Sequence, residues 1–236
     1  MAKKTIRARL TYQESVAGTV LFLLYLFAFP LLSERIFNAV EVLLDRSVSS
    51  SLRNVLYYYF LFAAVLLLFH RYLADAAKRF LNNIQRSLAT LVLGLLLFYG
   101  ANELIYRVGR VLLDSHTNLN DMTIAAQVHT APRMTTLIIV LLAPFVEEVF
   151  FRGLVFDGLR DKSRLLAYLL SSALFAFLHV WTFALSAWDA TYFVLMLQYL
   201  VPGFVFAWTC EHSGTIAVPM LLHAAVNALS LWTILR

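Results

Sequence analysis

Two adjacent carboxylates, Glu147 and Glu148, stand with Arg152 inside a stretch that is otherwise uncharged from residue 134 to residue 156. Hydrocarbon does not solvate charge, so charged side chains in a membrane-spanning stretch mark a functional site by default. Glu148 and Arg152 are four residues apart on one helical face, and they can form an ion pair. Glu147 points about 100° away. Without a cation of its own, Glu147 suits a general base that acts on water.

The later apolar stretches hold the partners that such a base would need. His179 can orient or share the attacking water. His223 and Asn227 are again four residues apart, so an imidazole N–H and an amide NH₂ lie on one helical face. Two such donors stabilise the oxyanion that forms when an acyl bond is attacked. Glu147, His179, His223 and Asn227 are therefore the predicted catalytic residues of a hydrolase acting on an acyl bond.

A side-chain nucleophile fits the sequence less well. Ser213 and Cys210 lie near the end of a predicted span and have no evident triad partner, which disfavours a serine or cysteine enzyme. Cys210 is the single cysteine. An intramolecular disulfide and a metal site built from several cysteines are therefore excluded.

Each feature also has a purely structural interpretation. Glu148 with Arg152 can be a buried ion pair that only holds helices together. His179 with Phe175 can be a hydrogen-bonded histidine on a packed aromatic face, and the polar pair of the last stretch can join helices by hydrogen bonds. The aromatic run at residues 57–60 is expected to face lipid or to pack. The combination of base, positioner and oxyanion donors favours the catalytic interpretation.

The composition predicts a membrane protein. Hydrophobic residues make up 61% of the chain and charged residues 14%, and the mean hydropathy is +0.75. These values lie far outside the range of soluble globular proteins. The net charge of +5 comes from basic residues in short loops rather than on one polar face, which argues against nucleic-acid binding. We expect an all-α polytopic bundle of transmembrane helices.

Seven stretches are long enough to cross a bilayer, and the shorter segment at residues 36–44 leaves open an eighth span. That segment could instead lie in the interface or re-enter the membrane. The sequence therefore predicts seven to eight spanning helices. The seven stretches are residues 16–32, 54–69, 88–105, 134–157, 165–187, 191–209 and 214–235.

The distribution of basic residues predicts the orientation. Loops on the side of the N-terminus carry more lysine and arginine than those on the other side, which favours a cytoplasmic N-terminus. The first apolar stretch is too long for a signal peptide and lacks a cleavage site, so we expect a retained span. The loop at residues 113–132 and the turn at Trp188 and Asp189 are then expected on the outer side. The short chain and short loops favour a prokaryotic plasma membrane.

Three motifs in this order on successive spans resemble the CPBP family of intramembrane proteases (CAAX proteases and bacteriocin-processing or Abi proteins). This family includes the Ras-converting CAAX prenyl endopeptidase. The motifs are Glu147-Glu148-x-x-x-Arg152, Phe175-x-x-x-His179 and His223-x-x-x-Asn227. The resemblance covers about residues 132–232 and none of the first 130. It divides the chain into N-terminal helices without recognised motifs (1–131) and a protease core (132–236).

The resemblance implies a glutamate-dependent intramembrane endopeptidase of mostly helical fold, with eight spans in the prenyl-protease members. It implies that Glu147 and His179 activate the water and that the last motif binds the oxyanion. Glu148, Arg152 and Phe175 would support the site.

The resemblance also raises zinc, because the family was first regarded as metal-dependent and two histidines with a carboxylate can hold zinc. We favour a site without a metal or other cofactor. Asn227 is a poor zinc ligand but a good oxyanion donor, and the sequence contains no His-Glu-x-x-His motif.

The expected partners are the lipid bilayer and a peptide or protein substrate. A prenylated CAAX protein, a bacteriocin leader and a membrane signalling protein all remain open as substrates. The alternative function is a catalytically silent membrane adaptor or bacteriocin-immunity protein that acts by binding a membrane partner. A transporter is disfavoured, because the chain has no inverted repeat with broken helices.

Overall fold

The computed structural model describes residues 9–112 and 119–235, and over this part of the chain every regular element is a helix. The predicted all-α fold is confirmed. The basic residues before position 9, the loop residues 113–118 and Arg236 lie outside the described residues. The predicted orientation and most of the predicted outer loop depend on these residues and stay predictions. The α-helices are α1 (Tyr12–Leu23), α2 (Phe29–Leu44), α3 (Ser50–Leu68), α4 (His70–Asn82), α5 (Ile84–Leu112), α6 (Leu119–Thr130), α7 (Pro132–Leu137), α8 (Ala143–Glu148), α9 (Asp157–Leu159), α10 (Arg164–Leu178), α11 (Trp181–Ala187), α12 (Met196–Ser213) and α13 (Ala217–Ile234). Three π-helical segments, η1 (Leu24–Ala28), η2 (Ile138–Leu142) and η3 (Val149–Phe156), and the 3₁₀ segment η4 (Ala190–Leu195) complete the fold.

The helices form a multi-pass membrane bundle. Among the described residues, six helices are long and apolar enough to span a bilayer, and the bent pair α10 and α11 brings the number to seven. The prediction of an eighth span at residues 36–44 was wrong. These residues continue the first helix, which runs from Tyr12 to Leu44, because no glycine or proline interrupts the chain between Pro30 and Leu44.

The prediction of one continuous span at residues 165–187 was also wrong. It is broken into α10 and α11, which meet at an angle of 43°. His179 follows the last residue of α10, so a predicted catalytic side chain stands at the break. The predicted turn at Trp188 is present, since Trp188 ends α11 in the left-handed conformation and its side chain is 90% exposed.

Two of the π-helical segments coincide with prolines. A proline lacks an N–H, and its ring clashes with the carbonyl four residues earlier, so the helix must widen or bend there. Pro30 follows η1, which contains Leu26 at that earlier position, and Pro144 follows η2, which contains Val140. These wide turns lie in two of the helices that reach the candidate site.

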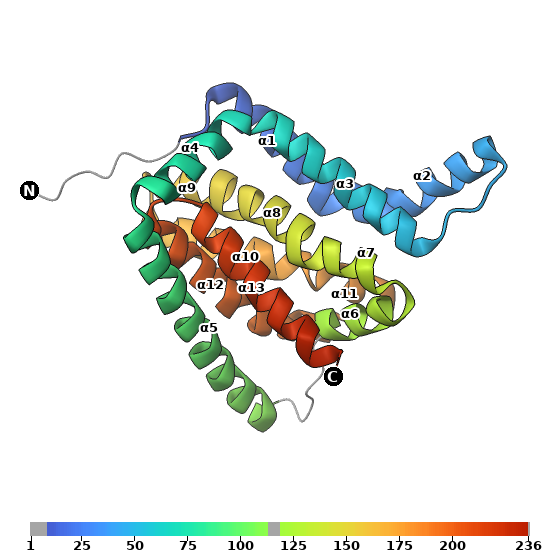
Figure 1. The fold of residues 1–236 in the computed structure, drawn as a ribbon. Helices are drawn as coiled ribbons and strands as arrows, with labels where there is room; N and C mark the ends of the chain where they lie inside the picture. The colour runs from blue at the N-terminus through green and yellow to red at the C-terminus, as the bar shows by residue number, and fades with distance from the viewer. Residues whose placement is uncertain (1–8, 113–118, 236) are drawn as a thin grey trace, which may run out of the picture.

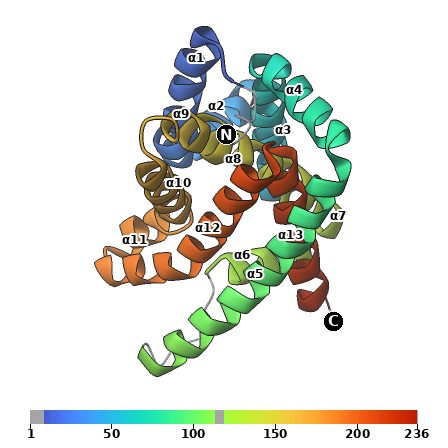
Figure 2. The same ribbon diagram turned by 90° about the vertical axis from the view of Figure 1, so that its left-hand side faces the viewer.

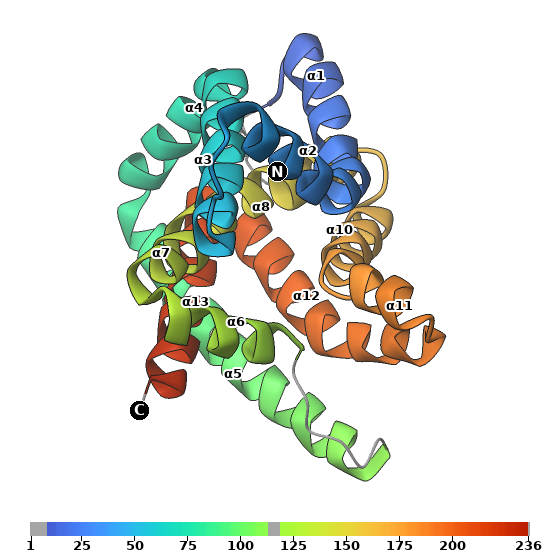
Figure 3. The same cartoon turned by 90° about the vertical axis from the view of Figure 1, so that its right-hand side faces the viewer.

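The helical run from Pro132 to Leu159 is the axis of the bundle (Figure 1). α1 and α3 pack against it on one side and α10 and α13 on the other. α12 packs between α10 and α5, and α13 also contacts α5, an arrangement seen in the two turned views (Figures 2 and 3). α2 contributes no buried residue and projects from the bundle (Figure 1).

Short-range hydrogen bonds define several helix ends. Thr11 caps α1 in a capping box with Glu14, and Ser163 accepts the backbone N–H of Leu166 at the start of α10. Gly214 ends α12 at a φ of +77°, a left-handed conformation that favours glycine.

The short helix α4 is held against the core at its buried face. The Tyr72 hydroxyl donates to Asp157 Oδ2 at 2.9 Å. Burial raises the pKa of Tyr72, and the nearby Asp157 carboxylate raises it further, so the phenol stays a neutral donor. Thr215 Oγ1 donates to the Ala76 carbonyl at 2.8 Å. α4 therefore ties the end of α3 to the loop before α13.

Candidate active site

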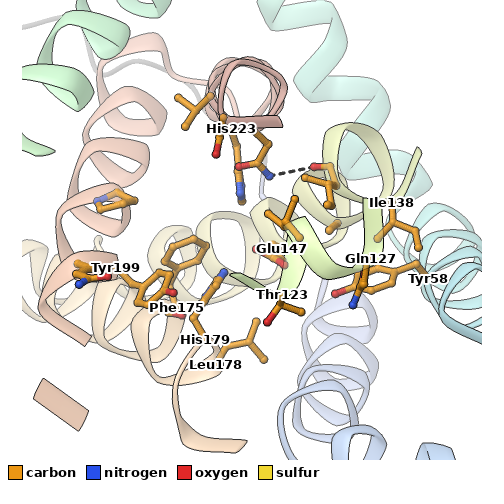
Figure 4. Close-up of a pocket in the computed structure, with 18 of the residues that line it drawn as sticks. Tyr58, Thr123, Gln127, Ile138, Glu147, Phe175, Leu178, His179, Tyr199 and His223 are labelled. Atoms are coloured by element: carbon orange, nitrogen blue, oxygen red, sulfur yellow. Dashed lines mark hydrogen bonds between the residues drawn. The ribbon is translucent and has the colours of Figure 1, made fainter. Parts of the chain in front are cut away.

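One cavity gathers the four predicted catalytic side chains. It has a volume of about 1100 Å³ and is lined, among others, by Glu147, His179, His223 and Asn227. Figure 4 shows Glu147 between His223 and His179, with Phe175 beside them. These groups come from α8, the break after α10, and α13. Side chains from three separate sequence motifs therefore meet in one cavity.

Glu148 and Arg152 lie behind the cavity wall and are fully buried. Arg152 Nη1 is 3.0 Å from Glu148 Oε1, so the ion pair expected from the four-residue spacing is present. Arg152 Nη2 also donates to the Gly203 carbonyl at 3.1 Å. The guanidinium carbon lies 4.7 Å from the Phe175 ring centroid and 5.1 Å from that of Phe206. Phe175 therefore supports the arginine through a cation–π contact.

The same oxygen of Glu148 also holds the histidine of the last motif. His223 Nδ1 lies 3.0 Å from Glu148 Oε1, and the imidazole stacks on the Phe206 ring at 4.7 Å. Ionised carboxylates only accept hydrogen bonds, so Nδ1 is the donor in this contact and Nε2 is left for the cavity. The contact between His223 and Glu148 could not be predicted from the sequence, because 75 residues separate the two side chains.

Asn227 is held by a hydrogen bond to a backbone carbonyl that lacks its usual intrahelical donors. The Ala143 N–H bonds to the Ile138 carbonyl in the wide turn, and Pro144 has no N–H. The Ile139 carbonyl therefore lacks both of its usual intrahelical donors. Asn227 Nδ2 donates to it at 2.9 Å. Since an amide NH₂ carries two N–H groups, one anchors the side chain and the other remains for a ligand.

His179 is oriented through its own helix. Its Nδ1 lies 2.9 Å from the Phe175 carbonyl, and its ring stacks against Tyr199 at 4.7 Å. A backbone carbonyl can only accept, so Nδ1 carries the proton and a neutral His179 has its lone pair on Nε2. His179 can therefore accept a hydrogen bond in the cavity.

Glu147 meets a residue from the N-terminal helices. Its side chain is 5% exposed, and Oε1 accepts the Tyr25 hydroxyl at 3.3 Å. Oε2 has no hydrogen-bond partner within the described part of the chain. Tyr57 and Tyr58 pack against each other, as expected for residues 57–60, and both also line the same cavity. Sequence analysis missed the tyrosines because spacing within one helix does not indicate which distant helix lies beside it.

The donor set does not form a ready metal site. Across residues 9–112 and 119–235, no three side chains of histidine, cysteine, aspartate or glutamate come together as a group that could hold a metal ion. The cavity instead offers the Glu147 carboxylate and His179 Nε2 as hydrogen-bond acceptors and the second N–H of Asn227 as a donor. His223 Nε2 is a further donor when the ring is doubly protonated. Acceptors orient a water molecule and donors stabilise an oxyanion.

Comparison with known proteins gives one family. Residues 130–229 match the family model described as type II CAAX prenyl endopeptidase Rce1-like. Neither the curated proteins nor the solved structures contain a match to the chain. The matched residues include all three motifs, and bacteriocin immunity receives no support from the match.

Proposed function

Residues 130–229 form an Rce1-like type II CAAX prenyl endopeptidase domain in a multi-pass membrane protein, and on this basis we propose that the chain is an intramembrane endopeptidase. In this proposal it hydrolyses a peptide bond of a membrane-associated or lipidated protein or peptide. The observation that supports the proposal most strongly is that the chemically active side chains of three separate motifs line one cavity.

The nucleophile is a water molecule between two acceptors. The Glu147 carboxylate lines the cavity, and His179 presents a lone pair on Nε2. Each accepts one hydrogen of the water, so the oxygen lone pair is directed at the substrate carbonyl. Glu147 takes the proton as the water oxygen bonds to the carbonyl carbon. The carboxyl group then returns this proton to the amine nitrogen as the C–N bond breaks.

The oxyanion is stabilised from the opposite side. His223 Nδ1 donates to Glu148, and in its doubly protonated form the ring also donates from Nε2 to the oxyanion. The second N–H of Asn227 is the other donor. Arg152 pairs with the same oxygen of Glu148 and holds it in place. Removal of one oxyanion donor typically lowers kcat by about 10²–10³.

The cavity walls favour a substrate with a large apolar part. Phe29, Phe37, Phe98 and Trp232 are among the lining residues. A peptide that carries a prenyl group near its scissile bond would place the lipid against such walls and the peptide bond at Glu147. We extend the proposal to a prenylated CAAX-type substrate, reached in a prokaryotic plasma membrane with the N-terminus in the cytoplasm.

Cleavage of defined peptides by the purified protein tests the proposal. Matched quenched peptides, prenylated and unprenylated, are incubated with and without a chelator, and the products are identified by mass spectrometry. We expect cleavage of the prenylated peptide at a single bond, unaffected by the chelator, and a loss of about 10²–10³-fold in kcat for Asn227→Ala. Glu103→Gln, at an exposed position of α5, is the control that keeps full activity. Absence of cleavage of either peptide would overturn the proposal and favour the silent adaptor.

A further inference from the structure

We propose that Tyr25, in the N-terminal part of the chain, is a positioning residue for Glu147. Its hydroxyl holds one carboxyl oxygen and so fixes the orientation of the carboxylate. The inference rests on the proposed function, since it names how the base of that site is oriented. It assigns a role in the site to the N-terminal helices, which lie outside the matched domain.

The contact between Tyr25 and Glu147 is buried and joins distant parts of the chain. The Tyr25 side chain is 2% exposed, and its hydroxyl donates to Glu147 Oε1 at 3.3 Å across 122 residues of sequence. The Tyr25 ring packs on Phe150 with centroids 5.3 Å apart. Phe22, one turn earlier, contacts both Phe150 and Phe151 at 5.4 Å. The ring is therefore fixed by packing, independently of the hydroxyl.

The hydroxyl is not needed to fill space. A phenylalanine would occupy nearly the same volume, without the free-energy cost of burying a polar group. A buried phenol requires a partner, and here it uses the carboxylate that the proposed mechanism needs. A hydrogen bond to an ionised acceptor is stronger than one between neutral groups. This contact therefore constrains the Glu147 rotamer more than packing alone would.

The local backbone directs Tyr25 at the site. Tyr25 lies in the wide turn η1, which Pro30 induces, and such turns are frequent at functional sites. Up to this turn the first helix packs against the core, and after it α2 buries no residue. Tyr25 and Leu26 are the last buried residues of this helix. The turn thus ends the packed part of the helix at the residue that contacts the base.

The two oxygens of the Glu147 carboxylate have different surroundings. Oε1 accepts Tyr25, and Oε2 is buried without a partner in the described part of the chain. The Tyr25 hydrogen bond is thus the contact that fixes the direction of the carboxylate, and a misplacement of about 1 Å can lower a rate by about 10²-fold. Loss of the hydroxyl should therefore affect the chemical step more than substrate binding.

Kinetics of Tyr25→Phe test the proposal, with Tyr59→Phe as the control. Tyr59 is a tyrosine of α3 whose side chain is 56% exposed and which is not among the residues that line the cavity. We expect Tyr25→Phe to lower kcat about 10- to 100-fold with KM and thermal stability unchanged. Tyr59→Phe should behave as wild type. Equal kcat values for Tyr25→Phe and wild type, or an equal loss in both variants, would overturn the proposal while leaving the proteolytic function intact.

A second readout does not depend on activity. The infrared difference spectrum between wild type and Glu147→Gln isolates the carboxyl band of Glu147. We expect this band to shift in Tyr25→Phe and not in Tyr59→Phe, because only the first variant removes a hydrogen bond from the carboxyl group. An unshifted band would overturn the role of Tyr25 even if the wild-type protein cleaved none of the peptides.

Discussion

The first three spanning helices and the central helix differ in how deeply they are buried. In the most apolar window of the Pro132–Leu159 run, 67% of the residues are buried, against 22%, 11% and 17% for the helices that begin at Tyr12, Ser50 and Ile84. All of these windows are similarly apolar, with mean hydropathies between 1.5 and 2.1. Hydropathy therefore identifies spans, but it does not indicate which span is the axis of the bundle.

The central helix and the early helices also differ in where their polar side chains lie. The central helix turns its charged residues inward, where Arg152 and Glu148 are surrounded by protein. The early helices expose many leucines, as expected of a surface that faces lipid, and they reach the site through a few tyrosines. The early helices act as a wall of the cavity, and the matched domain supplies its chemistry. Substitutions in the two regions should therefore have different consequences.

The largest expected effect is the loss of the buried arginine. Arg152→Met should destabilise the protein by about 3–5 kcal/mol, because it leaves Glu148 without its cation in a region of low dielectric. Arg107→Met removes an exposed ion pair with Glu103 and should cost about 0–1 kcal/mol. Unfolding by SDS in mixed micelles measures both changes. Similar losses in the two variants would contradict the contrast between core and wall.

The next effect concerns the close approach of α12 to α10. A Cβ at Gly203 would lie 2.9 Å from the Ser172 Cα, which is backbone and cannot move aside. Gly203→Ala should therefore cost about 1–3 kcal/mol through overpacking. Gly100→Ala, where a Cβ meets nothing within 4 Å, should leave stability unchanged or raise it slightly. Thermal unfolding in detergent compares the two, and a stable Gly203→Ala variant would mean that these helices pack less closely than described.

The smallest effect is expected from a single interhelical hydrogen bond. Ser171 Oγ donates to the Phe151 carbonyl at 2.7 Å and joins α10 to η3. Ser171→Ala should cost about 0.6 kcal/mol, the average for such bonds between membrane helices. Ser186→Ala, at an exposed position where the hydroxyl bonds within its own helix, is the control and should cost less. A larger loss for Ser186→Ala, measured by the same micelle titration, would reverse the predicted order of the buried and the exposed hydrogen bond.

The sequence predicted the parts of the site that depend on spacing within one helix. The Glu148–Arg152 ion pair and the helical class are confirmed, because both follow from local periodicity and composition. The catalytic roles of Glu147, His179, His223 and Asn227, and the division of the chain at residue 131, stay predictions.

The parts that were missed depend on tertiary packing. The contact of His223 with Glu148 and that of Tyr25 with Glu147 join segments 75 and 122 residues apart, and no periodicity indicates which helices become neighbours. The wide turns did have a signal, since Pro30 and Pro144 each lie just after one. Pro144 also explains why the Ile139 carbonyl lacks a backbone donor and can accept the Asn227 amide.

The most direct test of the account is the rate of peptide cleavage by Glu147→Gln, measured with the prenylated peptide beside wild type and Glu103→Gln. A glutamine has nearly the same shape but cannot take a proton from water, so the rate should fall by about 10²–10⁴-fold, the contribution of a general base. The Glu103→Gln control should cleave at the wild-type rate. Cleavage by folded Glu147→Gln at the wild-type rate would contradict the account.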